Sequence, residues 1–120
     1  MLKLSTIMIG TTRLQVLGDF YEKVFGRPAD MSDSNEGFFG WRFGDASLAV
    51  FTHSEMMGNT KDPGRLMINY ATEQVKEEFE RIRDLGGKVV SEPYQMGEAW
   101  VATLADPDGN YFQLIPPSMG

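Results

Sequence analysis

The order of predicted strands and helices repeats within the chain, and this repeat constrains the fold more than any other feature. Residues 4–10 predict a strand, and residues 14–25 then carry apolar side chains at helical spacing. Residues 30–55 predict three short strands joined by turns. The same order begins again at residues 65–71, so each half is expected to form a strand, a helix and three further strands.

Each predicted helix has a start signal and a stop signal. Thr11 or Thr12 is expected to cap the first helix, which should end at Gly26. Thr72 is expected to cap the second helix, which should end at Gly86. Within the second helix, Lys76 and Glu80 are spaced i, i+4 and are expected to face water.

The residues between the halves favour a loop, because "MMGNTKDPGR" is rich in turn formers and shows no periodicity. We therefore expect a single α+β domain over residues 1–120, built from βαβββ units at about 1–57 and 65–117. A helix should cover one face of each sheet. The other face must also be covered, and the sister unit is the obvious candidate.

Composition excludes several classes of site and partner. The 120 residues include no cysteine, which excludes disulfides, thiolate metal sites and cysteine nucleophiles. The net charge of −6 disfavours nucleic acid and anionic lipid. Solubility is its simplest explanation, although it would also suit a cationic small molecule. The apolar run at the N-terminus is too short for a signal peptide or a membrane span. We therefore expect a cytoplasmic protein.

Three stretches carry a resemblance to a known superfamily: "LGDFYEKVFG", "VKEEFERIRDLGGKVV" and "ADPDGNYFQLI". With the repeated βαβββ order, they resemble the vicinal oxygen chelate superfamily. That superfamily includes glyoxalase I, extradiol dioxygenases, and the fosfomycin and bleomycin resistance proteins. The resemblance covers essentially the whole chain. It implies curved sheets around a cavity that is often completed across a homodimer.

The resemblance also implies where a metal would bind. Metal-dependent members use a His or Gln on the first strand of a unit and a Glu on the last strand. These positions fall here at Thr6, near Met67, near Ala49 and at Gln113. A hydroxyl, a thioether, a methyl group and one neutral amide would not hold a hard or borderline divalent ion. We expect no metal, no cofactor and no catalytic residue, which argues against an enzyme without excluding one.

Other candidate ligands give little support for a rebuilt metal site. The single histidine, His53, lies at a strand exit and is expected to be a solvated or hydrogen-bonded loop residue. A polar contact at the cavity mouth is its alternative role. Glu92 and Glu98 are expected to be exposed charges at strand ends.

The same face of each sheet should instead line an organic ligand. Strand alternation turns Thr6 and Met8 inward and leaves Ile7 and Ile9 against the helix. Trp41 and Trp100 are expected to occupy related places in the two units. Filling of the core is an equally good explanation for any single one of these residues. The expected ligand-binding residues are Thr6, Met8, Trp41, Met67, Asn69, Trp100, Tyr111 and Gln113.

The sequence therefore favours a metal-independent protein that binds a small molecule, as in the bleomycin-resistance branch. Aromatic and thioether side chains suit an aromatic or cationic compound, which the protein would sequester to give drug resistance. A lyase, isomerase or dioxygenase with non-standard metal ligands is the first alternative. A dimeric interaction module without a ligand is the second.

Overall fold

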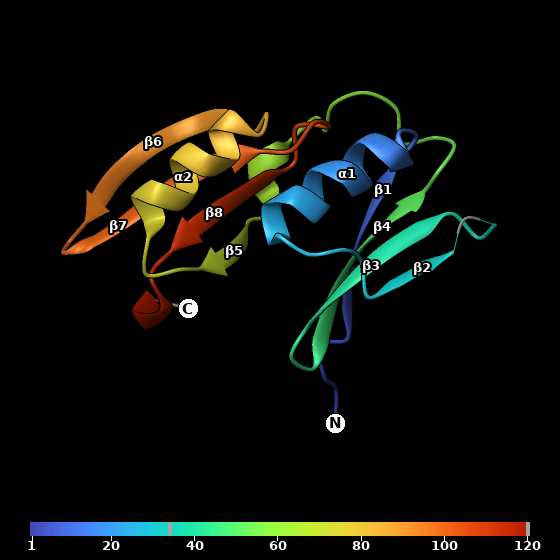
Figure 1. The fold of residues 1–120 in the computed structure, drawn as a ribbon, viewed down its shortest axis with the longest axis horizontal. Helices are drawn as coiled ribbons and strands as arrows, with labels where there is room; N and C mark the ends of the chain where they lie inside the picture. The colour runs from blue at the N-terminus through green and yellow to red at the C-terminus, as the bar shows by residue number, and fades with distance from the viewer. Residues whose placement is uncertain (34, 120) are drawn as a thin grey trace. The chain divides into compact units, whose positions relative to one another are not determined.

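The computed structural model describes residues 1–33 and 35–119, and the chain separates into two compact units, Met1–Gly58 and Asn59–Gly120. Each unit contains a four-stranded mixed sheet and one α-helix (Figure 1). Both sheets place the first and last strands of their unit side by side and parallel. The predicted α+β fold of two βαβββ units is confirmed.

In the first unit the strands run in the order β1-β4-β3-β2. The elements are β1 (Thr6–Thr11), α1 (Leu14–Phe25), β2 (Met31–Asp33), β3 (Phe38–Phe43) and β4 (Ala46–Thr52). The second unit repeats this arrangement with the order β5-β8-β7-β6. Its elements are η1 (Pro63–Arg65), β5 (Ile68–Ala71), α2 (Val75–Asp84), β6 (Lys88–Met96), β7 (Ala99–Ala105), β8 (Tyr111–Ile115) and η2 (Pro117–Met119).

The N-cap of each helix lies one or two residues later than predicted. Arg13 occupies the N-cap position of α1, and the hydroxyl of Thr11 accepts a hydrogen bond from the Arg13 backbone N–H at 2.9 Å. The second unit uses the same device, because Thr72 accepts from the backbone N–H of Gln74 at 3.1 Å. The two threonines therefore close the turn before each helix instead of capping it.

Two strands also differ from their predicted limits. The strand predicted over residues 4–10 instead spans Thr6–Thr11. It ends at Thr11 because the paired strand β4 ends opposite that residue, at Thr52. The strand predicted over residues 65–71 begins only at Ile68, because Pro63–Arg65 forms a 3-10 turn. Pro at the first position of that turn has the backbone angle that a helical turn requires.

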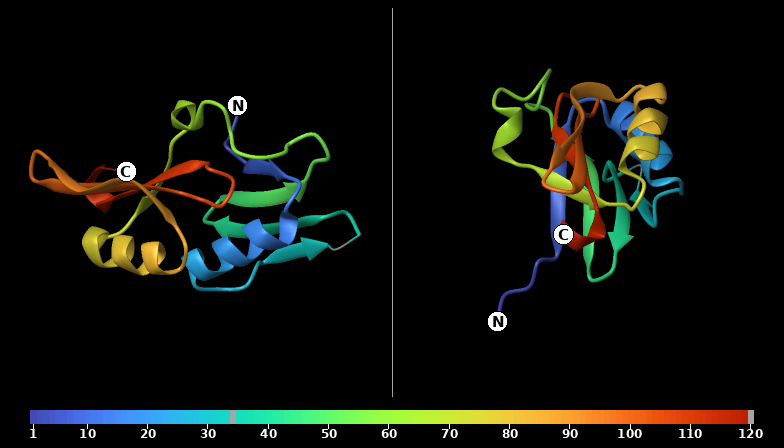
Figure 2. Two further views of the ribbon diagram at one scale, coloured as in Figure 1. Left: turned by 90° about the horizontal axis from the view of Figure 1, so that it is seen from above. Right: turned by 90° about the vertical axis from the view of Figure 1, so that its left-hand side faces the viewer.

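Each helix packs against one face of the sheet in its own unit, as the views in Figure 2 show. Between α1 and its sheet, Trp41 is 1% exposed and contacts the rings of Tyr21 and Phe25. Its indole N–H donates to the backbone carbonyl of Arg27 at 3.1 Å, so the buried polar group is satisfied. This cluster forms the core of the first unit.

A buried aspartate shapes the turn between β7 and β8. Asp106 is fully buried, and its carboxylate accepts hydrogen bonds from the backbone N–H groups of Asp108 and Asn110, both at 2.9 Å. The side-chain amide of Asn110 donates to the same carboxylate. These bonds fix the turn, and the turn fixes the register that places Gln113 opposite Thr103.

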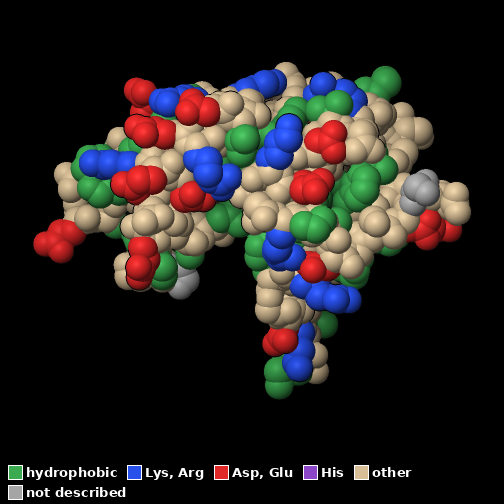
Figure 3. Space-filling view, viewed as in Figure 1, with side chains coloured by type: hydrophobic (Ala, Val, Ile, Leu, Met, Phe, Trp, Pro, Cys, Tyr) green, Lys and Arg blue, Asp and Glu red, His purple; other side chains and the backbone are tan. Residues whose placement is uncertain are grey.

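The surface over the helices mixes both signs of charge, with acidic and basic side chains interspersed in Figure 3. Such a surface gives no continuous positive face for a phosphate backbone in this view. Among the described residues, neither helix is long and apolar enough to cross a bilayer.

Candidate functional site

Strand register in the second unit brings predicted site residues onto the sheet face turned away from α2, which we call the distal face. Asn69 of β5 lies beside Gln113 of β8, and Gln113 in turn pairs with Thr103 of β7. Tyr111 shares this face because it lies two residues before Gln113 on the same strand. Met67 immediately precedes β5 and is half-buried.

The polar side chains that lie next to Gln113 on this distal face are neutral. The side-chain Nε2 of Gln113 donates a hydrogen bond to the hydroxyl of Thr103 at 3.3 Å. Gln113 is half-buried, whereas Asn69 is exposed. An amide, a hydroxyl and the phenol of Tyr111 can donate and accept hydrogen bonds without placing a net charge at the sheet.

In the first unit the corresponding distal face, turned away from α1, carries Thr6 and Met8. Met8 lies beside Ala49 and Thr6 lies beside Ser47 in the parallel β1–β4 pair. Met8 is 59% exposed and Thr6 is also exposed. The alternation predicted for β1 is therefore present, with the thioether and hydroxyl on one face and the isoleucines on the other.

The residues at the four family metal positions do not fit a divalent ion. Thr6 and Ala49 of the first unit, and Met67 and Gln113 of the second, supply at most one good oxygen donor per unit. No group of three or more His, Asp or Glu side chains in the described parts of the chain could hold a metal ion.

The two tryptophans lie on the opposite faces from these residues. Trp41 pairs with Leu48 in β4, which places its ring on the side of the sheet covered by α1. Trp100 lies on the side of α2, because the ammonium nitrogen of Lys76 sits 3.5 Å from the centroid of its ring. Neither indole is therefore grouped with Gln113, Asn69, Thr6 or Met8.

The expectation that Trp41 and Trp100 occupy related places is also wrong. Ala49 in β4 and Gln113 in β8 are corresponding positions on the last strand of each unit. Trp41 pairs with the residue just before Ala49, and Leu104 pairs with the residue just before Gln113. Leu104, rather than Trp100, is thus the counterpart of Trp41. Trp100 lies four residues earlier, near the start of β7, where the helix no longer buries it completely.

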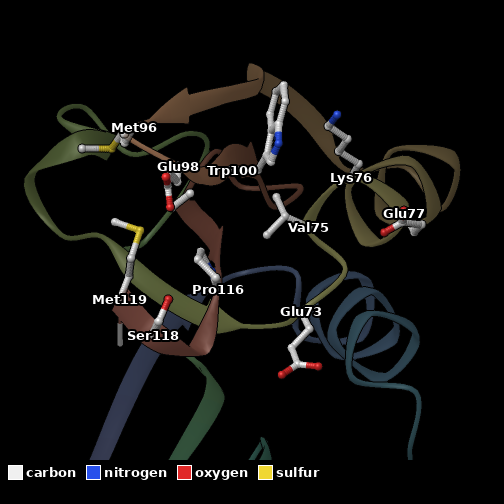
Figure 4. Close-up of a pocket in the computed structure, with 12 residues that line it drawn as sticks. Glu73, Val75, Lys76, Glu77, Met96, Glu98, Trp100, Pro116, Ser118 and Met119 are labelled. Atoms are coloured by element: carbon white, nitrogen blue, oxygen red, sulfur yellow. The ribbon is translucent and has the colours of Figure 1, made fainter.

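Trp100 instead lines a hollow of about 1030 Å³ at the end of the second sheet (Figure 4). The β6–β7 hairpin, the first turn of α2 and the segment after β8 surround it. Besides Trp100, its walls include Lys76, Glu98, Met96 and Met119. From the sequence alone Lys76 and Glu98 are expected only to be exposed charges, because residue spacing does not show that the hairpin lies next to the helix.

His53 is held in the loop after β4. Its ring Nδ1 accepts a hydrogen bond from the backbone N–H of Glu55 at 3.2 Å, and its own backbone N–H donates to the carbonyl of Thr11 at 2.8 Å. The prediction of a hydrogen-bonded loop histidine is consistent with these contacts. They give His53 a local structural role.

Comparison with known protein families identifies the chain. The model for a glyoxalase-like domain matches residues 6–115, which spans both βαβββ units. The chain belongs to the glyoxalase-like domain family. This membership, with the structural neighbours below, places it in the vicinal oxygen chelate superfamily that its motifs resemble.

Solved structures share the fold across nearly the whole chain. A glyoxalase-related enzyme from Fulvimarina pelagi is 19% identical with a TM-score of 0.80, and the match covers 98% of this chain and 90% of that one. A glyoxalase/bleomycin resistance protein/dioxygenase family enzyme from Burkholderia phytofirmans PsJN is 22% identical with a TM-score of 0.74, covering 96% and 98%. A glyoxalase/bleomycin resistance protein from Albidiferax ferrireducens T118 is 20% identical with a TM-score of 0.73, covering 94% and 98%.

None of the curated proteins matches the chain. At these identities the solved structures establish the fold but not the activity.

Proposed function

We propose that this glyoxalase-like protein binds a small organic molecule, aromatic or cationic, without a metal ion. The observation that carries the proposal is the hydrogen bond from Gln113 to Thr103, with Asn69 beside it on the same face. At this position metal-dependent relatives are expected to present a carboxylate. Here three neutral groups stand together and suit the hydrogen-bonding atoms of an organic ligand.

Exposed apolar side chains on the distal faces favour the same function. Met8 is largely exposed on β1, and Tyr111 offers a half-buried ring on β8. A thioether adapts to irregular ligand shapes, and an aromatic ring stacks on planar ones. Sequestration of such a ligand, as in drug resistance, is the biological role that this chemistry supports.

Ligand-induced stabilisation tests the proposal. A ligand at about ten times its Kd stabilises a protein by about 1.4 kcal/mol. Screening aromatic and cationic compounds by thermal shift should therefore yield compounds that raise the Tm by several degrees. The Gln113→Leu variant should lose most of that shift, while Gln15→Leu, an exposed helix position, should retain it. A panel without a saturable shift, or a shift equal in both variants, would argue against the proposal.

We also propose that the protein works as a cytoplasmic homodimer, in which a second copy completes the ligand site. Met8 in β1, together with Leu4 just before that strand at 67% exposure, places apolar surface at the edge of the sheet. Light scattering after size exclusion should give twice the chain mass at micromolar concentration. Met8→Lys should shift it to the monomer mass, whereas Val16→Lys on the exposed side of α1 should not. A monomer mass for the unmodified chain would contradict the dimer.

A further inference from the structure

The hollow beside Trp100 has the chemistry of a site for an organic cation. Trp100 is half-buried in β7, so part of its indole surface is accessible beside α2. The side chain of Lys76 places its ammonium nitrogen 3.5 Å from the ring centroid. This contact is well within the range of about 6 Å over which a cation is attracted to an aromatic face. The ring already attracts a cation from its own chain.

Charge in the hollow favours a positive guest. Three glutamates and one lysine line it, so negative side chains outnumber positive ones. In the view of Figure 4, Trp100 stands between Lys76 of α2 and Glu98 of the β6–β7 hairpin. The carboxylate of Glu98 therefore lies, in this view, on the side of the ring away from the lysine. Attraction of this kind is strongest where water is partly excluded.

The remaining walls suit the apolar part of such a molecule. Met96 and Met119 bring two thioethers into the hollow from the hairpin and from the segment after β8. Val75 and Pro116 add aliphatic surface. The volume of about 1030 Å³ exceeds what a single ammonium group needs, so it accommodates a cation with an organic body.

From these contacts we infer that the hollow binds an organic cation, of the quaternary ammonium class, over the indole of Trp100. In the free protein the ammonium group of Lys76 lies against the same ring, so it competes with the ligand and lowers the affinity for the organic cation. Glu98 supplies a negative charge in the wall of the same hollow. The inference rests on the proposed function, because it names a class of ligand for a protein that binds small molecules. The hollow is a separate place from Gln113 and the distal face.

Choline and its uncharged isostere 3,3-dimethylbutan-1-ol provide the test. Choline should produce a saturable change in tryptophan emission and shift the NMR methyl signals of Met96 and Met119, whereas the isostere should produce neither. Trp41 is 1% exposed, so its emission supplies an internal reference. Equal responses to the two compounds, or no saturable response to choline, would overturn the inference.

Matched variants locate the site. Lys76→Met should tighten choline binding about twofold to tenfold, because the ring loses its competing cation. Glu98→Gln should weaken binding by a similar factor. Lys61→Met and Glu92→Gln make the same charge changes at other exposed positions and should leave the Kd unchanged. If Lys61→Met and Glu92→Gln changed the Kd as much as Lys76→Met and Glu98→Gln, the net charge alone would explain the effect and the proposed site would be refuted.

A Trp100→Leu variant should lose the methyl shifts of Met96 and Met119 while its circular dichroism still reports a folded protein. If it does not fold, Lys76→Met and Glu98→Gln decide the matter, because both residues are exposed. Failure here is distinguishable from failure of the proposed function. If the parent protein does not bind choline while other compounds still give a thermal shift that depends on Gln113, only this inference is overturned.

Discussion

The side-chain Nε2 of Gln113 lies 3.3 Å from the hydroxyl oxygen of Thr103, across the antiparallel pair of β7 and β8. The amide therefore has a partner within its own sheet and does not require a metal to satisfy it. Because Thr103 is 5% exposed, its hydroxyl depends on this contact more than an exposed hydroxyl would. The pair links the stability of the sheet to the chemistry of the proposed site.

Replacing Thr103 with valine should lower the free energy of unfolding by about 1 kcal/mol, since the side chain keeps its shape and loses the acceptor. A double-mutant cycle with Gln113→Leu, measured by urea unfolding, should give a coupling energy of about 0.5–1.5 kcal/mol. Thr12→Val, at an exposed position, should stay within about 0.5 kcal/mol of the parent. If the two substitutions changed the free energy of unfolding additively, the hydrogen bond between Gln113 and Thr103 would make no contribution to stability.

Much of the fold follows from sequence because its signals are local. The repeated order of elements, the ends of both helices and the alternation in β1 depend on periodicity and on Gly and Pro. The placing of Trp41 and Trp100 depends on register between strands distant in sequence. A one-residue change of register moves a side chain to the other face, so strand patterns alone could not assign the indoles.

The late start of the helices has a different cause. A threonine before a helix has the right chemistry for a cap, so the sequence predicts Thr11 or Thr12 as the first cap and Thr72 as the second. Thr11 and Thr72 both form a different hydrogen bond. Each instead accepts a hydrogen bond from the residue two positions on, which is a local turn. A capping threonine and a threonine that closes a turn give the same sequence signal, so only the backbone geometry distinguishes them.

The hollow beside Trp100 could not be predicted from the sequence, because it forms where three segments distant in sequence meet.

Gly18 offers a test of packing against helix propensity. It lies within α1, where alanine would normally stabilise a helix by up to about 1 kcal/mol. A methyl group there would lie 2.6 Å from a ring carbon of Phe39, so the ring would have to move. Overpacking of this kind costs about 1–3 kcal/mol.

Gly18→Ala should therefore lower the Tm in a thermal melt. Combining it with Phe39→Ala should make the alanine neutral or stabilising relative to Phe39→Ala alone, because the obstructing ring is gone. A rise in Tm for Gly18→Ala in the parent chain would show that the ring yields without cost.

Asp30 gives the first unit a dependence on pH. The backbone N–H of Arg42 donates to its carboxylate at 2.7 Å, and this bond, followed by the hydrogen bond from Arg27, holds the pKa of Asp30 below its ordinary value of 3.8. A lowered pKa in the folded state means that the charged form is favoured by folding. The stabilisation is therefore present above pH 3.8 and is lost as the pH falls through the folded pKa.

Comparing the parent with Asp30→Asn tests this sign. The difference in free energy of unfolding should be constant near neutral pH and should shrink below pH 4, measured by urea unfolding at several pH values. Asp45→Asn, in the exposed turn after β3, is the control for a general loss of charge. A difference that grows on acidification would contradict the assigned direction.

The most direct test of the central claim is the metal content of the purified protein, measured by inductively coupled plasma mass spectrometry without prior exposure to chelator. We predict divalent metal well below one ion per chain, with ligand-induced stabilisation unchanged by EDTA. One tightly held divalent ion per chain, removable by EDTA together with the ligand response, would contradict a metal-independent binding site.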